Sequence, residues 1–157
     1  MQCADFKPPD PNFATRVTDS FRDQVIMDSM GITLEAVEPG GVTLSMPFNP
    51  AFVQQHGFHH AGTTTTAMDS ACGYAAMTLM PATAEVLTVE FKVSLMAPAA
   101  GARFEFRGRV VKPGRTLMFT EGEAIAHGAP RSGQDGKVIA TMTATMMVVE
   151  GRSGINR

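Results

Sequence analysis

The chain has 157 residues, which is enough for one domain with a single hydrophobic core. Apolar residues make up 44% of it, which excludes a disordered or fibrous protein. Charged residues are only 18% and the net charge is −2, so a nucleic-acid partner is not expected, whereas a buried interface between subunits would fit.

The cysteines and the N-terminal residues predict a reduced, cytoplasmic protein. Cys3 and Cys72 are too few for a disulfide framework. Residues 1–11 contain three prolines and lack the apolar stretch of a signal peptide. No run of 18 apolar residues occurs, so we expect no membrane partner.

The first part of the chain predicts a helix and then a β-hairpin. Residues 1–11 are expected to be an extended lead-in, and Asn12 is a typical N-cap residue. Apolar residues then recur every fourth position until Gly31 ends the helix. This stripe consists of Phe13, Val17, Phe21 and Val25. Alternating apolar residues over 32–36 and 42–48, with a Pro-Gly-Gly turn between them, predict two paired strands.

The remainder predicts one buried helix and four strands. Residues 49–60 form a loop, and residues 61–79 are apolar on nearly every side, which is typical of a helix buried all round. The strands are expected over 87–95, 104–110, 117–127 and 138–149, with a loop at 128–136 and a frayed tail at 151–157. In the first of them, an apolar face alternates with a polar face that carries Thr88, Glu90, Lys92 and Ser94.

This order of elements predicts an α+β fold. Consecutive strands joined by short turns pair antiparallel. A long twisted antiparallel sheet wrapped around the one buried helix satisfies both patterns. We expect a single domain over residues 12–150.

Asp69 is the only charged or histidine residue between Ala61 and Ala84. Burying a carboxylate costs several kcal/mol unless it is paired or hydrogen-bonded. Asp69 therefore either meets solvent or a neighbouring hydroxyl for structural reasons, or serves in a functional site. The first-turn N–H groups of the same helix are unsatisfied donors that suit a developing oxyanion.

An ordered set of residues surrounds this helix. It begins with Gln54, Gly57, His60-Ala61-Gly62 and Asp69. It continues with Thr88-Val89-Glu90-Phe91, then Leu95-Met96-Ala97-Pro98-Ala99, then Lys112-Pro113-Gly114-Arg115-Thr116-Leu117. The set resembles the signature of the hot-dog-fold acyl-CoA thioesterases, in particular the phenylacetate-pathway (PaaI-like) group, over roughly residues 30–150. Ala61 stands where the family usually has glycine, but it still offers a backbone N–H.

The resemblance implies hydrolysis of an acyl-CoA thioester to the free acid and coenzyme A, without a cofactor. Asp69 would act as general base or nucleophile, and the Ala61 N–H would polarise the carbonyl. Gln54 would orient the thioester or the water, and Thr88 would hold the water. The implied substrate-binding residues are Gly57, His60, Gly62, Glu90, Lys112, Gly114, Arg115 and Thr116. Lys112 and Arg115 would meet the coenzyme A phosphates, while aryl, medium-chain and branched acyl groups all stay open.

The geometry of the helix predicts a site shared between subunits. Nine residues from His60 to Asp69 make about half a turn net and advance about 13 Å along the axis. The helix start and Asp69 therefore cannot easily meet one thioester within one chain. A two-fold axis could bring Asp69 of one subunit against Gln54 and Ala61 of the other, so we expect a homo-oligomer, either dimer or tetramer.

The histidines and Cys72 allow other interpretations. His56, His59 and His60 could suggest a metal site, but the resemblance places His60 at the helix start, and no metal is expected. Cys72 lies among alanines in the buried helix, which favours an inert core residue over a nucleophile. The alternative functions are a non-catalytic acyl-CoA binding protein, against which Asp69 argues, and a hot-dog enoyl-CoA hydratase or dehydratase, whose His–carboxylate pattern is not found.

Overall fold

The computed structural model describes residues 6–128 and 136–151. The helices are α1 (Phe13–Asp23), α2 (Val25–Met30), the 3-10 turn η1 (Pro50–Phe52) and α3 (Ala61–Met77). The strands are β1 (Thr33–Glu38), β2 (Gly41–Pro47), β3 (Glu85–Leu95), β4 (Arg103–Lys112), β5 (Leu117–His127) and β6 (Lys137–Val149). Cys3, most of the predicted loop and nearly all of the predicted tail lie outside the described residues.

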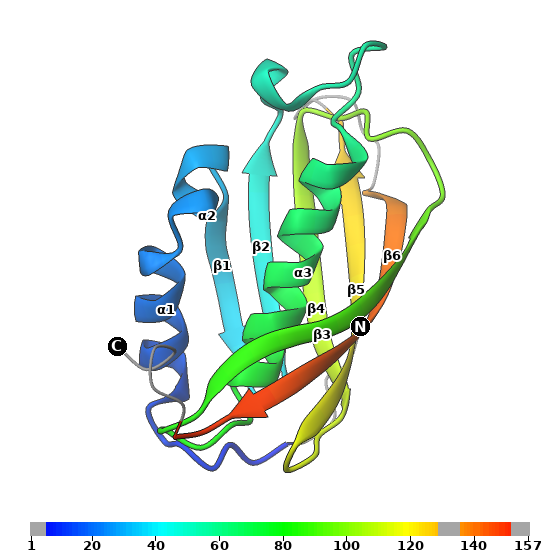
Figure 1. The fold of residues 1–157 in the computed structure, drawn as a ribbon. Coiled ribbons are helices and arrows are strands. Elements are labelled where there is room, and N and C mark those ends of the chain that lie inside the picture. The colour runs from blue at the N-terminus through cyan, green and yellow to red at the C-terminus, as the bar shows by residue number, and fades with distance from the viewer. Residues whose placement is uncertain (1–5, 129–135, 152–157) are drawn as a thin grey trace.

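All six strands form one antiparallel sheet in the order β1-β2-β4-β5-β6-β3. The central helix α3 lies across one face of this sheet and contacts β2 to β6, while α1 and α2 lie beside β1 (Figure 1). The predicted α+β arrangement of a twisted sheet around one central helix is therefore confirmed. Among the described residues, no helix has both the length and the apolar character needed to cross a membrane.

The helix α3 is held very close to β4. Its sheet-facing residues are small or flexible, and Ala67, Met68, Ala71 and Cys72 are fully buried. A Cβ atom added at Gly108 of β4 would lie 2.3 Å from the backbone of Ala71, so only glycine allows this approach. The contact fixes the height of α3 over the sheet, and with it the position of the neighbouring Asp69.

The predicted N-terminal helix is wrong in one respect, because it is broken at Gln24. That residue has an extended backbone with φ −81° and ψ 90°, and it separates α1 from α2. The chain bends so that the Gln24 side chain reaches Ser70 and Tyr74 of α3. After the break Val25 is 75% exposed, although the apolar stripe predicted it to be buried. Gly31 ends α2 in the left-handed conformation, as expected.

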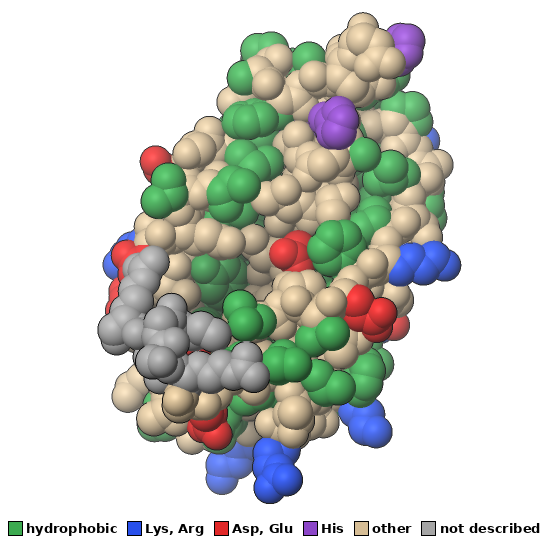
Figure 2. All heavy atoms as spheres, in the orientation of Figure 1, with side chains coloured by type: hydrophobic (Ala, Val, Ile, Leu, Met, Phe, Trp, Pro, Cys, Tyr) green, Lys and Arg blue, Asp and Glu red, His purple; other side chains and the backbone are tan. Residues whose placement is uncertain are grey.

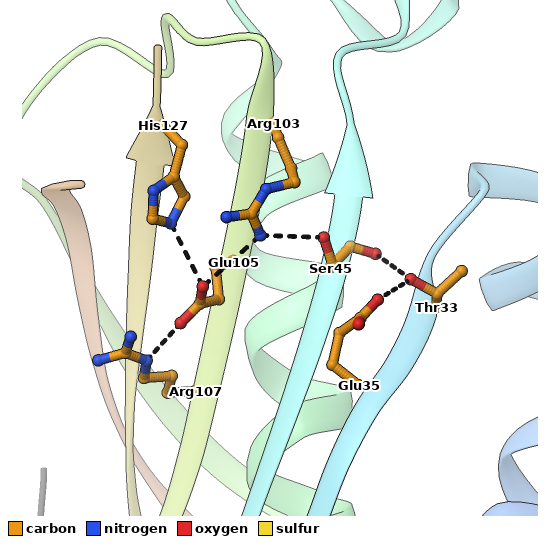
Figure 3. Close-up of polar contacts among 7 residues, drawn as sticks. All are labelled: Thr33, Glu35, Ser45, Arg103, Glu105, Arg107 and His127. Atoms are coloured by element: carbon orange, nitrogen blue, oxygen red, sulfur yellow. Dashed lines mark hydrogen bonds and ion pairs between the residues drawn. The ribbon is translucent and has the colours of Figure 1, made fainter. Parts of the chain in front are cut away.

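The face of the sheet opposite α3 carries a cluster of charged side chains around Glu105. Glu105 of β4 accepts a hydrogen bond from Arg107 and lies within ion-pair distance of Arg103 and His127 (Figure 3). Arg103 also donates a hydrogen bond to the Ser45 hydroxyl of β2. Burial raises the pKa of Glu105, but the hydrogen bond and charge of Arg107, with the other two cations, lower it overall. Glu105 alternates along β4 with the buried Phe104 and Phe106, so the cluster lies on the opposite face of the sheet from the core.

Candidate active site

Asp69 lies half-buried on α3, and the hydroxyl of Thr88 on β3 donates a hydrogen bond to its Oδ1 atom at 2.8 Å. Burial raises the pKa of this carboxyl, and the Thr88 hydrogen bond partly lowers it again. In the part of the chain that the structure describes, no other hydrogen-bond donor contacts Asp69. Its Oδ2 atom is therefore available to a water molecule or a substrate carbonyl.

A β-bulge brings Thr88 to Asp69. The register of β3 against β6 shifts between Thr88 and Glu90, so Val89 is the extra residue. Thr88 pairs with Met146 and Phe91 pairs with Ala144, and these partners lie two residues apart on β6. Thr88 thus shares the α3 side of the sheet with Phe91, and its predicted place on the polar face of a strictly alternating strand is wrong.

Asp69 and Thr88 open onto a cavity of about 810 Å³ between α1, α3 and the start of β3. Ser70, Gly73 and Tyr74 of α3 continue its wall beyond Asp69, and Gln24 faces them from the helix break. The volume lies within the range of small-molecule sites in proteins. The cavity can therefore hold a group attached to a carbonyl carbon at Asp69.

The first turn of α3 leaves one N–H group open. The N-cap His60 accepts a hydrogen bond from the Gly62 N–H on Nδ1 at 2.9 Å, and its carbonyl accepts from Thr63 and Thr64. The Ala61 N–H has no hydrogen-bond partner among residues 6–128 and 136–151. An exposed, unsatisfied N–H at a helix N-terminus can donate to a developing oxyanion.

A second cavity, of about 650 Å³, adjoins this helix start. Gln54, His60 and Ala61 line it together with apolar residues such as Leu95 and Met96. Gln54 belongs to a tight turn in which its Oε1 accepts from the His56 N–H and its carbonyl from the Gly57 N–H at 3.0 Å. Gly57 has φ 83°, a left-handed conformation that favours glycine. The amide nitrogen of Gln54 can donate into this cavity.

The predicted site residues fall into two separate groups within one chain. Asp69 and Thr88 line the first cavity, whereas Gln54, His60 and Ala61 line the second, and the described linings share no residue. The two groups thus line different cavities of one chain, and a site shared between subunits stays a prediction.

The remaining predicted residues line neither cavity. Lys112, Gly114, Arg115 and Thr116 lie at the turn between β4 and β5, at the opposite end of the sheet from the first turn of α3 (Figure 1). Gly114 is required there, because a Cβ atom would lie 2.2 Å from the Leu117 carbonyl oxygen. Glu90 accepts a hydrogen bond from Thr145 of β6 at 3.0 Å.

The histidines and Cys72 have structural surroundings. His59 is stacked on Phe48, and its Nε2 accepts from the Asn49 N–H at 3.0 Å. Burial lowers the pKa of His59, which favours the neutral form of the ring. Burial raises the pKa of Cys72 to about 12, so this thiol is not a nucleophile at neutral pH. Within the described residues, no three His, Cys, Asp or Glu side chains cluster as metal ligands.

Sequence reasoning missed Gln24, Ser70, Gly73 and Tyr74 as parts of the site. Gln24 lies 46 residues before Ser70 in the chain, and an apolar stripe gives no sign of such a contact. A glycine inside a predicted helix was the one available signal, since glycine is unfavourable there without a reason.

A six-stranded antiparallel sheet around a single central helix is the arrangement of the hot-dog fold. The family model of the Thioesterase superfamily matches residues 56–129. The crystal structure of a thioesterase family protein from Silicibacter pomeroyi is 50% identical, with a TM-score of 0.84, over 88% of this chain and 99% of that one. The chain belongs to the thioesterase superfamily.

Two further proteins are similar to this chain, one in sequence and one in fold. A candidate esterase from Saccharolobus solfataricus is 27% identical over 107 residues, which is 68% of this chain and 71% of that protein. The PaaI protein of the Escherichia coli phenylacetic acid degradation operon shares the fold, with a TM-score of 0.77 at 14% identity over 89% of this chain and 96% of that one. Membership of the superfamily supports a hydrolase that acts on thioesters.

Proposed function

We propose that this protein hydrolyses an acyl-CoA thioester to the free acid and coenzyme A, with Asp69 as the general base or nucleophile. The observation that carries the proposal is the half-buried Asp69 carboxylate, held on one oxygen by Thr88 and open on the other to a cavity of ligand size. Either a water molecule or the carbonyl carbon can approach the free oxygen.

The carbonyl is polarised by the open N–H of Ala61, and the amide of Gln54 orients the thioester. Both groups come from the partner subunit, because within one chain they line a different cavity from Asp69. Lys112 and Arg115 are exposed cations that attract the phosphates of coenzyme A. Coenzyme A leaves as a thiolate without a strong general acid, since thiols have pKa values near 8.5.

The exposed strand β3 supports such a pairing of subunits. It is an edge strand, and Phe91 and Leu95 on it are 48% and 57% exposed. Figure 2 shows hydrophobic side chains gathered on the face that β3 crosses, around an acidic side chain near its middle. An apolar edge strand with unpaired backbone groups tends to associate with other chains when it is exposed to solvent. A second copy of this chain would cover it.

The test is a panel of acyl-CoA thioesters scored by release of free thiol, with Asp69→Asn as the control enzyme. We expect Asp69→Asn to lose about 10²–10⁴-fold in kcat, the usual contribution of a general base. Turnover of the variant at the wild-type rate would remove Asp69 from the mechanism. Wild-type protein that binds acyl-CoA but releases no thiol would instead indicate a binding protein.

The stability of the Asp69→Asn variant separates catalysis from folding. In the wild-type protein the pKa of Asp69 is raised, so the folded protein binds the Asp69 proton more tightly than the unfolded chain does. Stability is therefore lost as the pH rises from the unfolded-state pKa through the folded-state pKa, and the loss is complete once Asp69 is ionised in the folded protein. We expect Asp69→Asn to melt no lower than wild type at pH 7, so its lost activity is not caused by unfolding.

A further inference from the structure

Four consecutive threonines, Thr63 to Thr66, lie in the first two turns of α3, although threonine is a poor helix former. A threonine hydroxyl in a helix commonly donates to a nearby backbone carbonyl. The Thr66 hydroxyl donates to the carbonyl of Gly62 at 2.8 Å, and the Thr63 hydroxyl to that of Phe52 at 3.3 Å. Thr65 is only partly buried, so solvent can satisfy its hydroxyl. Local structure therefore accounts for three of the four hydroxyl groups.

The fourth hydroxyl, that of Thr64, is buried without a partner. Thr64 is 3% exposed, and its hydroxyl makes no hydrogen bond to any of residues 6–128 and 136–151. A buried hydroxyl that lacks a partner is unfavourable, and valine would fill the same space without this cost. Packing within the chain therefore does not explain why position 64 carries a hydroxyl.

The Thr64 side chain lines the second cavity, of about 650 Å³. Gln54 and Ala61 line the same cavity, and most of its other lining residues are apolar. In a largely apolar cavity, the few polar groups of the wall fix the orientation of a bound ligand. The Thr64 hydroxyl is one of these few groups, and it is free to bind.

Thr64 is a neighbour of the open N–H group of Ala61. The two residues are three positions apart, so they lie on the same side of α3. Side chains of a helix lean toward its N-terminus, which brings the Thr64 hydroxyl back over the first turn. A carbonyl oxygen has two lone pairs, so one such oxygen in this cavity can accept from both donors.

We propose that the Thr64 hydroxyl is a second donor, beside the Ala61 N–H, to the oxygen of the thioester carbonyl. When water or the Asp69 carboxylate bonds to the carbonyl carbon, an electron pair moves onto this oxygen, and it returns as the carbon–sulfur bond breaks and the thiolate leaves. Both hydrogen bonds are strongest while the oxygen is negatively charged, and Thr64 keeps its own proton throughout. This inference rests on the proposed function, since it completes the oxyanion site of that reaction.

The test compares Thr64→Val with wild type on the acyl-CoA thioester that wild type hydrolyses fastest. Valine has the shape of threonine without the hydroxyl. We expect kcat to fall about 10²-fold, the scale on which loss of one oxyanion donor acts, with KM nearly unchanged. Thr64→Ser keeps the hydroxyl and should retain most of the activity.

Two controls separate this role from a structural one. Thr64→Val should melt no lower than wild type, because it removes an unpaired hydroxyl and valine is about as favourable as threonine in a helix. Thr65→Val makes the same change one residue further along, at a position outside the described linings of both cavities. This variant should keep the wild-type kcat.

The outcomes distinguish this inference from the proposed function. Turnover of Thr64→Val at the wild-type rate would overturn the inference. So would a raised KM with unchanged kcat, which would mean that the hydroxyl binds a part of the substrate remote from the carbonyl. A lower Tm that accounts for the lost activity would also overturn it, since the hydroxyl would then be structural. Wild-type protein that hydrolyses no acyl-CoA thioester would instead overturn the proposed function, and the role of Thr64 with it.

Discussion

At the scale of single residues, the reactivity of Asp69 depends on two opposing influences. Burial in α3 favours the protonated carboxyl, whereas the hydroxyl of Thr88 stabilises the carboxylate. Thr88 reaches Asp69 only because the bulge at Val89 turns it toward the helix. The bulge therefore positions the hydroxyl group that partly lowers the pKa of the proposed base.

Thr88→Ala should move the acidic limb of the pH–rate profile to higher pH. The variant removes the interaction that lowers the pKa of Asp69, so burial acts alone and a higher pH is needed to ionise the base. Measurement of kcat/KM against pH provides the test. Thr88→Ser keeps the hydroxyl and should leave the limb in place; an unmoved limb in Thr88→Ala would show that this hydrogen bond does not tune Asp69.

At the scale of elements, Arg16 fastens α1 to the end of α3. Its guanidinium donates to three backbone carbonyls at and beyond the C-terminal end of α3 and pairs with Asp10, whose side chain is 4% exposed. Met77 is the last residue of α3, and a cation near the C-terminal end of a helix interacts favourably with the helix dipole. The same contact fixes α1 as a wall of the cavity beside Asp69.

Arg16→Met should reduce the free energy of unfolding by about 3–5 kcal/mol, the usual cost of breaking one side of a buried ion pair. Urea denaturation followed by circular dichroism measures it. Arg22→Met is the matched control on the same helix, since its pair with Asp19 is exposed and worth about 0–1 kcal/mol. Equal losses in the free energy of unfolding would mean that the Arg16 contacts stabilise the fold no more than an exposed ion pair does.

At the scale of the whole molecule, one chain contains two incomplete halves of the proposed site. The carboxylate and Thr88 lie on one cavity, and the helix N-terminus with Gln54 lies on another. The apolar edge strand β3 is the surface through which a second copy would join them. A two-fold interface is reciprocal, so it would complete two sites at once.

Mixed dimers of Asp69→Asn and Gln54→Ala subunits should recover activity. Each variant is expected to be inactive alone, but a mixed dimer has one doubly altered site and one intact site. Unfolding the two together and refolding them should restore roughly a quarter of wild-type activity, because about half of the dimers are mixed and each has one working site of two. Mixed dimers confirmed by mass but without activity would place Gln54 and Asp69 in the same subunit's site.

The sequence by itself determined the order of elements and the lone carboxylate. Period-2 and period-3.6 patterns in the apolar residues follow directly from backbone geometry, so the six strands and the central helix could be predicted. Asp69 was visible because a charge in an apolar helix is costly, and the Ala61 N–H because every helix start leaves donors open.

Only the tertiary structure decided which residues accompany Asp69. The break at Gln24 and the bulge at Val89 each interrupt a regular pattern, and both depend on contacts between segments distant in the chain. Periodicity records the average direction of side chains along one element, so it places Val25 and Thr88 on the wrong faces. The cavity at Gly73 likewise exists only where α1, α3 and β3 meet, because an empty volume is a property of packed elements rather than of any one segment.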